Sequence, residues 1–137
     1  LRNEKPLRHI SSSSFSPIFA GIPSNERAEK LAATMMSKFG NEDYYLCASF
    51  NPTSERFNPK KYWRGPVWIN LNWMLYNGFS KYGFSDIAQR IKEDSVELIE
   101  KHGFHEYFDA RKEIGNGGYG GNNFSWSAAL LIDLLNR

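Results

Sequence analysis

The chain has 137 residues, 41% of them apolar and 23% charged, which is typical of one globular domain and leaves no room for two ordinary ones. No apolar run approaches the roughly 20 residues of a bilayer span, and the net charge of +2 is spread without a basic stripe, so neither a membrane nor a nucleic-acid partner is indicated. Cys47 is the only cysteine, which excludes an intrachain disulfide and favours a reducing, cytoplasmic location.

The first half of the chain predicts one helix between less regular segments. Residues 1–16 contain a serine run and a proline and show no periodicity, so we expect them to be irregular or part of a truncated helix. From Ser24 to about Phe39 apolar residues recur at helical spacing, with Ser24 as N-cap and Gly40 suited to follow the helix. Residues 41–61 are rich in turns and predict a long loop with a short strand at 44–47.

The second half begins with a predicted αα-hairpin. Pro66 is expected at the first position of a helix that continues to about Lys81, and Gly83 is expected to end it. A second helix, capped by Ser85, reaches Gly103. The few residues between the two helices predict that they lie antiparallel.

The end of the chain predicts a short strand at 104–108 and one last helix. Asn123 or Ser125 is expected to cap this helix, which continues to Leu135 and is apolar nearly all round. Such a helix needs packing partners on several sides. The sequence therefore predicts that the chain is a piece of a larger helical array.

The segment 61–73, KYWRGPVWINLNW, concentrates aromatic side chains around a Gly-Pro break. Aromatic residues make up 15% of the chain, more than a small core usually absorbs, so some are expected to line a groove or a partner surface. Flat rings suit the C–H faces of a sugar, and Arg64 and Asn72 are candidates for the polar rim that binds its hydroxyls. Plain core packing is the alternative for Trp68, Trp73 and Trp126, and pairing with a carboxylate is the alternative for Arg64.

Glu106, in the stretch GFHEYFD, is the candidate catalytic carboxylate. Inverting glycosidases use a carboxylic acid and a carboxylate base that lie roughly 6.5 to 9.5 Å apart. On the residues alone, a glutamate in a short strand is more often solvated or ion-paired. Asp109 is the nearest rival, but its DARKE context predicts a turn residue that bonds its own backbone.

The glycine-rich stretch GNGGYGGNN lacks the Gly-Lys-Ser/Thr ending and the βαβ pattern of nucleotide-binding loops. It is interpreted as a flexible connection that lets backbone approach a substrate or a neighbouring helix. His102 and His105 lie on either side of Gly103, and no cysteine or third histidine completes a ligand set. Neither a metal nor another cofactor is implied.

Three ordered motifs carry a resemblance to a known family: YWRGPVWINLNWMLYNGFSKYG, GFHEYFDARKEIGNGG and NNFSWSAALLIDLL. Together with SPIFAGIPSNERAEKL they resemble the C-terminal part of the catalytic domain of glycoside hydrolase family 63, over about residues 15–136. The similarity is greatest to the branch of mannosylglycerate and glucosylglycerate hydrolases, and the processing α-glucosidase I belongs to the same family. Looser patterns of this kind occur in trehalases.

The resemblance implies an all-α fold of helical hairpins, part of an (α/α)₆ toroid, with residues 1–137 as the C-terminal part of one catalytic domain. It implies that Glu106 is the general base of an inverting mechanism acting on a small α-glucoside or α-mannoside. The general acid, an aspartate of an earlier hairpin, has no matching motif in this chain. The implied substrate-binding residues are Tyr62, Trp63, Arg64, Gly65, Trp68 and Trp126.

Two hypotheses of different classes follow. In the first, the chain supplies the base and the aromatic sugar subsite of a glycosidase, and the rest of the toroid or another chain supplies the acid. On its own it is then expected to be inactive. In the second, the chain is a carbohydrate-binding or interaction module that has kept the aromatic cleft and lost the chemistry.

Overall fold

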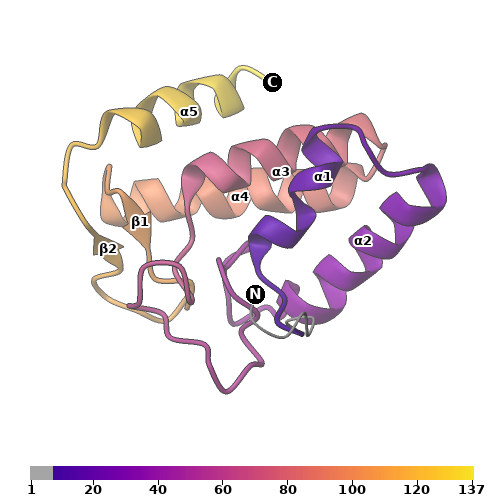
Figure 1. Ribbon diagram of the computed structural model, residues 1–137. Coiled ribbons are helices and arrows are strands. Elements are labelled where there is room, and N and C mark those ends of the chain that lie inside the picture. Colours follow the sequence, from indigo (N-terminus) through magenta and orange to yellow (C-terminus); the bar gives the residue numbers. More distant parts are fainter. Residues whose placement is uncertain (1–7) are drawn as a thin grey trace, which may run out of the picture.

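A central helix organises the structure. The computed structural model describes residues 8–137, and residues 1–7 lie outside the described part. Helix α3 (Ile69–Lys81) packs against α4 (Ser85–His102), α1 (Ser16–Phe19) and α5 (Ser125–Leu135). In Figure 1, α3 and α4 form the predicted antiparallel hairpin, α5 lies above them, and α2 (Asn25–Phe39) is at the right. The all-α fold class is therefore confirmed.

The segment before α2 is more regular than predicted. A 3₁₀ helix, η1 (Ser12–Phe15), leads directly into α1, and the Ser11 backbone N–H donates to Ser14 Oγ at 3.4 Å. The side chains of Phe15 and Ile18 are buried in the core. Of the two alternatives for residues 1–16, the structure has short helical turns over 12–16 in place of irregular chain. Residues 1–7 of that segment lie outside the described part.

The predicted start of α2 at Ser24 and the predicted glycines after α3 and α4 are confirmed. Ser24 Oγ accepts a hydrogen bond of 3.4 Å from the Arg27 backbone N–H at the start of α2, which ends at Phe39. Gly83, with φ +82°, follows α3, and Gly103, with φ +85°, caps α4. A positive φ is the backbone conformation that glycine adopts most easily, so these two positions carry a local signal for the hairpin.

Three helix starts differ from the prediction. Pro66 precedes α3 by three residues, because its carbonyl accepts a hydrogen bond from the Ser49 N–H and its backbone is held beside another segment. Phe84, not Ser85, occupies the N-cap of α4. Phe124 occupies the N-cap of α5, in place of the predicted Asn123 or Ser125. The rings of Phe84 and Phe124 pack edge-on against Phe79 and Trp126, at 6.1 and 5.3 Å, and this packing competes with the capping preference of serine and asparagine.

Two-residue strands replace the longer strands predicted. β1 (Tyr107–Phe108) pairs antiparallel with β2 (Gly118–Tyr119), so only the last part of 104–108 is a strand. The strand predicted at 44–47 is absent from the described chain, where that segment makes isolated bridges: Tyr44 with Arg111 and, just beyond, Ala48 with Val67. In Figure 1, β1 and β2 lie at the end of the hairpin where α3 begins and α4 ends.

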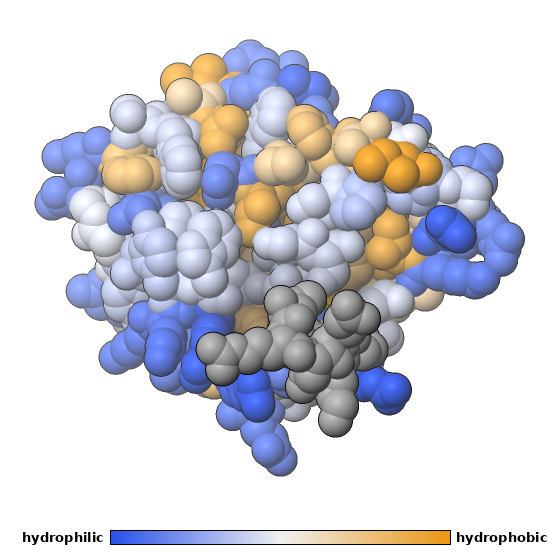
Figure 2. Space-filling view, viewed as in Figure 1, coloured by the Kyte–Doolittle hydropathy of each residue, from blue (hydrophilic) through white to orange (hydrophobic). Residues whose placement is uncertain are grey.

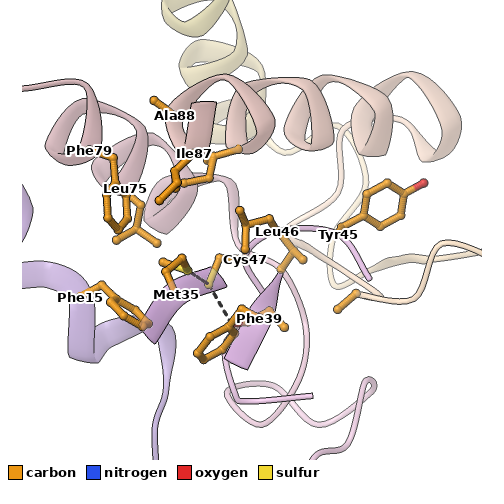
Figure 3. Close-up of a cluster of buried hydrophobic side chains, with 14 of the residues drawn as sticks. Phe15, Met35, Phe39, Tyr45, Leu46, Cys47, Leu75, Phe79, Ile87 and Ala88 are labelled. Carbon is orange, nitrogen blue, oxygen red and sulfur yellow. Dashed lines mark hydrogen bonds between the residues drawn. The ribbon is translucent and has the colours of Figure 1, made fainter. Parts of the chain in front are cut away.

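The hydrophobic core lies between the hairpin, α1, α2 and the segment 45–48. Figure 3 shows Phe15, Met35 and Phe39 facing Leu46 and Leu75. Cys47 is enclosed with its Sγ 3.6 Å from the Met35 Sδ, and burial raises the pKa of its thiol. Because a buried, protonated thiol is unreactive in either redox environment, the cytoplasmic location stays a prediction.

Helix α5 is attached on one side and exposed on the other. The Trp73 indole N–H of α3 donates to Asp133 Oδ2 at 2.6 Å, whereas Ile132 and Leu135 are 62% and 57% exposed. In Figure 2, hydrophobic side chains show along the top, over α5, and near the turn between α1 and α2. Across the described residues, no helix is long and apolar enough to cross a bilayer.

Candidate active site

Three chain segments lie side by side at the β1 end of the hairpin and position the candidate residues. Val67 exchanges two backbone hydrogen bonds with Phe108, at 2.8 and 2.9 Å, and also bridges to Ala48. Trp68 follows Val67, and Glu106 lies two residues before Phe108. The pairing therefore brings the aromatic segment and the candidate carboxylate together, although they are far apart in the sequence.

Four rings, which we call the aromatic platform, pack beside Glu106: Tyr62, Trp63, Trp68 and Tyr107. The ring of Trp63 stacks on that of Trp68, with centroids 4.2 Å apart and planes 6° apart. Tyr107 stacks on Trp68 at 5.0 Å and 23°. Tyr62 meets Trp68 edge-on at 4.7 Å. Trp63 and Tyr62 are 45% and 46% exposed, so they form the accessible surface of the platform.

Two of the predicted substrate contacts are covered in this structure. Trp68 is 1% exposed, between Trp63 and Tyr107, and its indole N–H donates to the Tyr62 carbonyl at 2.9 Å. It supports the platform and presents no free face to a sugar. Gly65 is buried as well: its N–H donates to Ser49 Oγ at 3.0 Å, and a Cβ at this position would overlap the Asn58 carbonyl. These two residues support the platform in this structure, and their direct contact with a substrate stays a prediction.

Glu106 is half-buried and held by two contacts. Its Oε1 accepts a hydrogen bond of 2.6 Å from the Tyr62 hydroxyl, and its backbone N–H donates to the Tyr119 carbonyl at 3.1 Å. The hydrogen bond to Glu106 is the largest cause that raises the pKa of Tyr62 above its ordinary value. Glu106 Oε2 is free of hydrogen bonds within the described residues, which leaves this oxygen able to accept a proton.

The other two predicted contacts border the platform. Trp126, in the first turn of α5, is 39% exposed and meets Trp68 edge-on at 6.4 Å. Ser127 Oγ donates to the His105 carbonyl at 2.7 Å, which fixes the start of α5 beside Glu106. Arg64 is exposed, and between residues 8 and 137 no carboxylate pairs with its guanidinium. Contact of Arg64 and Trp126 with substrate stays a prediction.

Asn72 does not belong to a polar rim. Its side chain is completely buried, where Oδ1 accepts from the Cys47 N–H at 3.1 Å. Its Nδ2 donates to the Leu46 carbonyl and to Ser95 Oγ, at 3.0 and 2.8 Å. Asn72 therefore fastens the segment that bridges to Val67, and the prediction that it binds sugar hydroxyls is wrong.

A buried acid network that the sequence did not suggest lies behind Glu106. The Asp109 side chain is fully buried and accepts hydrogen bonds from the Arg111 guanidinium, at 2.9 and 3.0 Å, and from the Tyr119 hydroxyl at 3.0 Å. Burial alone would raise the pKa of Asp109, but these hydrogen bonds hold it below its ordinary range. Burial, followed by the bond to Asp109, raises the pKa of Tyr119 to about 12.

The predicted turn at Asp109 is confirmed, because Oδ1 also accepts from the Arg111 backbone N–H at 3.0 Å. The two-residue spacing of Asp109 and Arg111 would have been enough to indicate the ion pair between them from the sequence. The bond from Tyr119 had no such signal, since it depends on the pairing of β1 with β2.

Two cavities among the described residues lie away from the platform. One of about 570 Å³ is lined by residues of α2 and of the turn after α3, and one of about 470 Å³ lies beside Asp43 and Arg111. Beside Glu106, the rings of Tyr62 and Trp63 are accessible to solvent. Throughout residues 8–137, His, Cys, Asp and Glu side chains form no cluster of three or more that could hold a metal ion.

The comparisons with known proteins agree with this geometry. Residues 1–127 match the mannosylglycerate hydrolase MGH1-like glycoside hydrolase domain. The mannosylglycerate hydrolase of Thermus thermophilus is 47% identical over 93% of this chain and 30% of its own length. The mannosylglycerate hydrolase MGH1 of Selaginella moellendorffii is 38% identical over 94% of this chain and 26% of its own length.

A solved structure gives the same result in three dimensions. The family 63 mannosylglycerate hydrolase from Thermus thermophilus, in complex with Tris and D-glycerate, superposes with a TM-score of 0.86. It is 46% identical and is matched over 97% of this chain and 31% of that one. The chain thus spans about a third of the length of these relatives, and its hairpins are those of an (α/α)₆ toroid. This chain belongs to the mannosylglycerate hydrolase MGH1-like family of glycoside hydrolases.

Proposed function

We propose that this chain forms one wall of the active site of an inverting glycoside hydrolase that cleaves a small α-mannoside or α-glucoside. Mannosylglycerate is the first candidate substrate, because the relatives matched here are mannosylglycerate hydrolases. Glucosylglycerate is the second. The observation that carries the proposal is the carboxylate of Glu106 beside the exposed rings of Tyr62 and Trp63.

In this proposal Glu106 is the general base. Tyr62 holds Oε1, so the orientation of the carboxylate is fixed, and Oε2 accepts a proton from water as that water attacks the anomeric carbon. The bond from that carbon to the glycerate oxygen breaks, and this oxygen receives a proton from an aspartic acid elsewhere in the toroid. The released sugar then has the opposite anomeric configuration to the substrate.

The platform binds the sugar ring. Trp63 is stacked on one side against Trp68 and is 45% exposed, so a pyranose can lie with its C–H face against the indole. Trp68 and Tyr107 keep that indole in place from below. Tyr62 stands at the edge of the platform and connects the sugar subsite to the base.

The remainder of the proposed domain supplies the acid and covers the apolar side of this wall. Residues 1–137 correspond to about a third of the relatives, so we assign them to the C-terminal part of one toroid. The exposed side chains of Ile132 and Leu135 on α5 are suited to packing against the other hairpins. The chain alone is then expected to have no turnover.

Replacement of Glu106 in the full-length protein tests the proposal. Glu106→Gln keeps the shape of the side chain and removes the base, so turnover of mannosylglycerate and glucosylglycerate should fall by several orders of magnitude. Glu113→Gln is the matched control, because Glu113 is an exposed glutamate of the same region and lies outside the site. Turnover of Glu106→Gln close to that of the control would reject Glu106 as the base.

The stereochemistry and the binding assay separate the alternatives. Proton NMR of the first product should show the inverted anomer, and a retained anomer would reject the inverting mechanism. Calorimetric titration of the unaltered protein with each glycoside tests the second hypothesis, in which the chain is a carbohydrate-binding or interaction module. Sugar binding without turnover of either glycoside would identify a binding module in place of an enzyme.

A further inference from the structure

The glycine-rich loop 115–121 lies directly against the candidate base. Gly120 has φ +74°, and a Cβ built on it would lie 2.6 Å from both Cβ and Oε2 of Glu106. The same Cβ would lie 3.2 Å from Tyr107 Cε1, on the aromatic platform. No side chain fits between this loop and the base, so the loop backbone occupies the space beside the carboxylate.

The loop is fastened just before this contact, at Gly117 and Tyr119, and cannot retreat easily. The Glu106 N–H donates to the Tyr119 carbonyl at 3.1 Å, and the Asp109 N–H donates to the Gly117 carbonyl at 2.8 Å. The Tyr119 hydroxyl donates to buried Asp109, and the Gly117 N–H donates to His102 Nδ1 at 3.2 Å. The loop is therefore fixed to segment 106–109, which includes Glu106.

Glu106 cannot turn out of the way either. Its Oε2 is the far end of a flexible side chain, but its Cβ is fixed by the backbone of the residue before β1. That backbone is held by the paired strand and by the two hydrogen bonds between Val67 and Phe108. A methyl group at position 120 would have to displace the loop, the carboxylate or both.

We propose that Gly120 is a positioning residue for Glu106: its bare backbone confines the carboxylate to the orientation in which Tyr62 holds Oε1 and Oε2 remains available. This inference rests on the proposed function, because it gives the loop a purpose only if Glu106 is the base. It also replaces the interpretation of the stretch as a flexible connection. Position 120 requires a glycine because the loop closes tightly on Glu106 there, and this tightness limits how the base can point.

Three alanine variants of the full-length protein test this role. Gly120→Ala should lower kcat on the order of 100-fold, the effect of misplacing a catalytic group by about 1 Å, and leave KM within a few-fold. Gly83→Ala has a similar positive φ but no atom within 4 Å of its Cβ, so it measures backbone strain alone. Gly121→Ala measures a methyl group in the same loop, where the nearest atom is Phe124 Cδ2 at 3.7 Å.

The outcomes are distinct. A kcat loss specific to Gly120→Ala supports the role, whereas equal kcat values for Gly120→Ala and Gly83→Ala overturn it. If Gly120→Ala does not fold, the double variant Glu106→Gly with Gly120→Ala is compared with Glu106→Gly. Recovery of a cooperative unfolding transition in the double variant supports the contact, and failure to recover overturns it. If Glu106→Gln itself remains active, the proposed function fails first, and that result does not depend on Gly120.

Discussion

The Tyr62 hydroxyl donates a hydrogen bond of 2.6 Å to Glu106 Oε1, and this bond joins two residues that are 44 positions apart in the sequence. It connects the exposed edge of the aromatic platform to the candidate base. Because the bond to Glu106 raises the pKa of the Tyr62 hydroxyl, titration of Tyr62 detects the bond without a substrate.

Glu106→Gln should lower the pKa of Tyr62 toward its ordinary value. The folded-state pKa of Tyr62 is raised, so the stabilisation that this bond gives is present below about pH 10 and is lost as the pH rises through the folded-state pKa. Titration of the Cζ signal in tyrosine-labelled protein, with Tyr62 assigned from Tyr62→Phe, measures the change. Tyr119, whose hydroxyl is bonded to Asp109, is the internal control. An unmoved Tyr62 titration would contradict the contact.

Trp63→Ala and Trp68→Ala should separate binding from stability. Trp63 is nearly half exposed, so its loss should weaken sugar binding by about 1–3 kcal/mol and change the folding stability little. Trp68 is buried, so its loss should lower the free energy of unfolding by about 3–5 kcal/mol. Calorimetric titration and denaturant unfolding give the two values. Equal effects of both variants on stability would argue against the exposed position of Trp63.

Asn72→Ala should lower the free energy of unfolding by about 3 kcal/mol. The replacement leaves the Cys47 N–H and the Leu46 carbonyl buried without their partner, at roughly 1–3 kcal/mol for each group. Asn77→Ala is the control, since Asn77 is half-buried in the same helix and its side chain bonds only the Trp73 carbonyl one turn earlier. Urea unfolding measures both. A loss for Asn72→Ala no larger than the control would reject its part in holding the 45–48 segment.

Asp109 should make stability depend on acid. Its pKa in the folded chain lies below the unfolded value of about 3.9, so its contribution is complete above that value and is lost as the pH falls through the folded-state pKa. Asp109→Asn should lower stability at pH 7 by about 2 kcal/mol and flatten the decline between pH 5 and pH 2. Denaturant unfolding at several pH values tests this, with Asp43→Asn, an exposed aspartate, as control. An unchanged decline in Asp109→Asn would contradict the prediction.

The sequence predicted elements where the determining residues are neighbours. The Ser24 cap, the amphipathic spacing of α2 and the glycines at 83 and 103 act within a few residues, and the structure has these features. The prediction failed where contacts between segments far apart in the sequence determine the structure. Asn72 was a candidate for a polar rim, but its side chain is buried, with bonds to segment 45–48 and to Ser95 of α4.

The candidate site was predicted in outline for the same reason. Glu106 and the aromatic segment were identified by their residue types, and the resemblance joined them. Which ring is exposed to solvent depends on how Trp63, Trp68 and Tyr107 stack once Val67 is paired with Phe108. That order exists only in the folded chain, so a sequence pattern could not distinguish the exposed Trp63 from the buried Trp68.

The paired backbone of Val67 and Phe108 also has a consequence for how such a site can evolve. It makes the candidate base and the aromatic platform one rigid body, with their separation set by main-chain bonds that substitutions of side chains hardly alter. In the proposed toroid, the distance from this body to the acid on another hairpin is set by how the hairpins dock. If the proposed function holds, mutations far from the site, in the contacts of α5 for example, adjust the gap between acid and base while each wall keeps its own geometry.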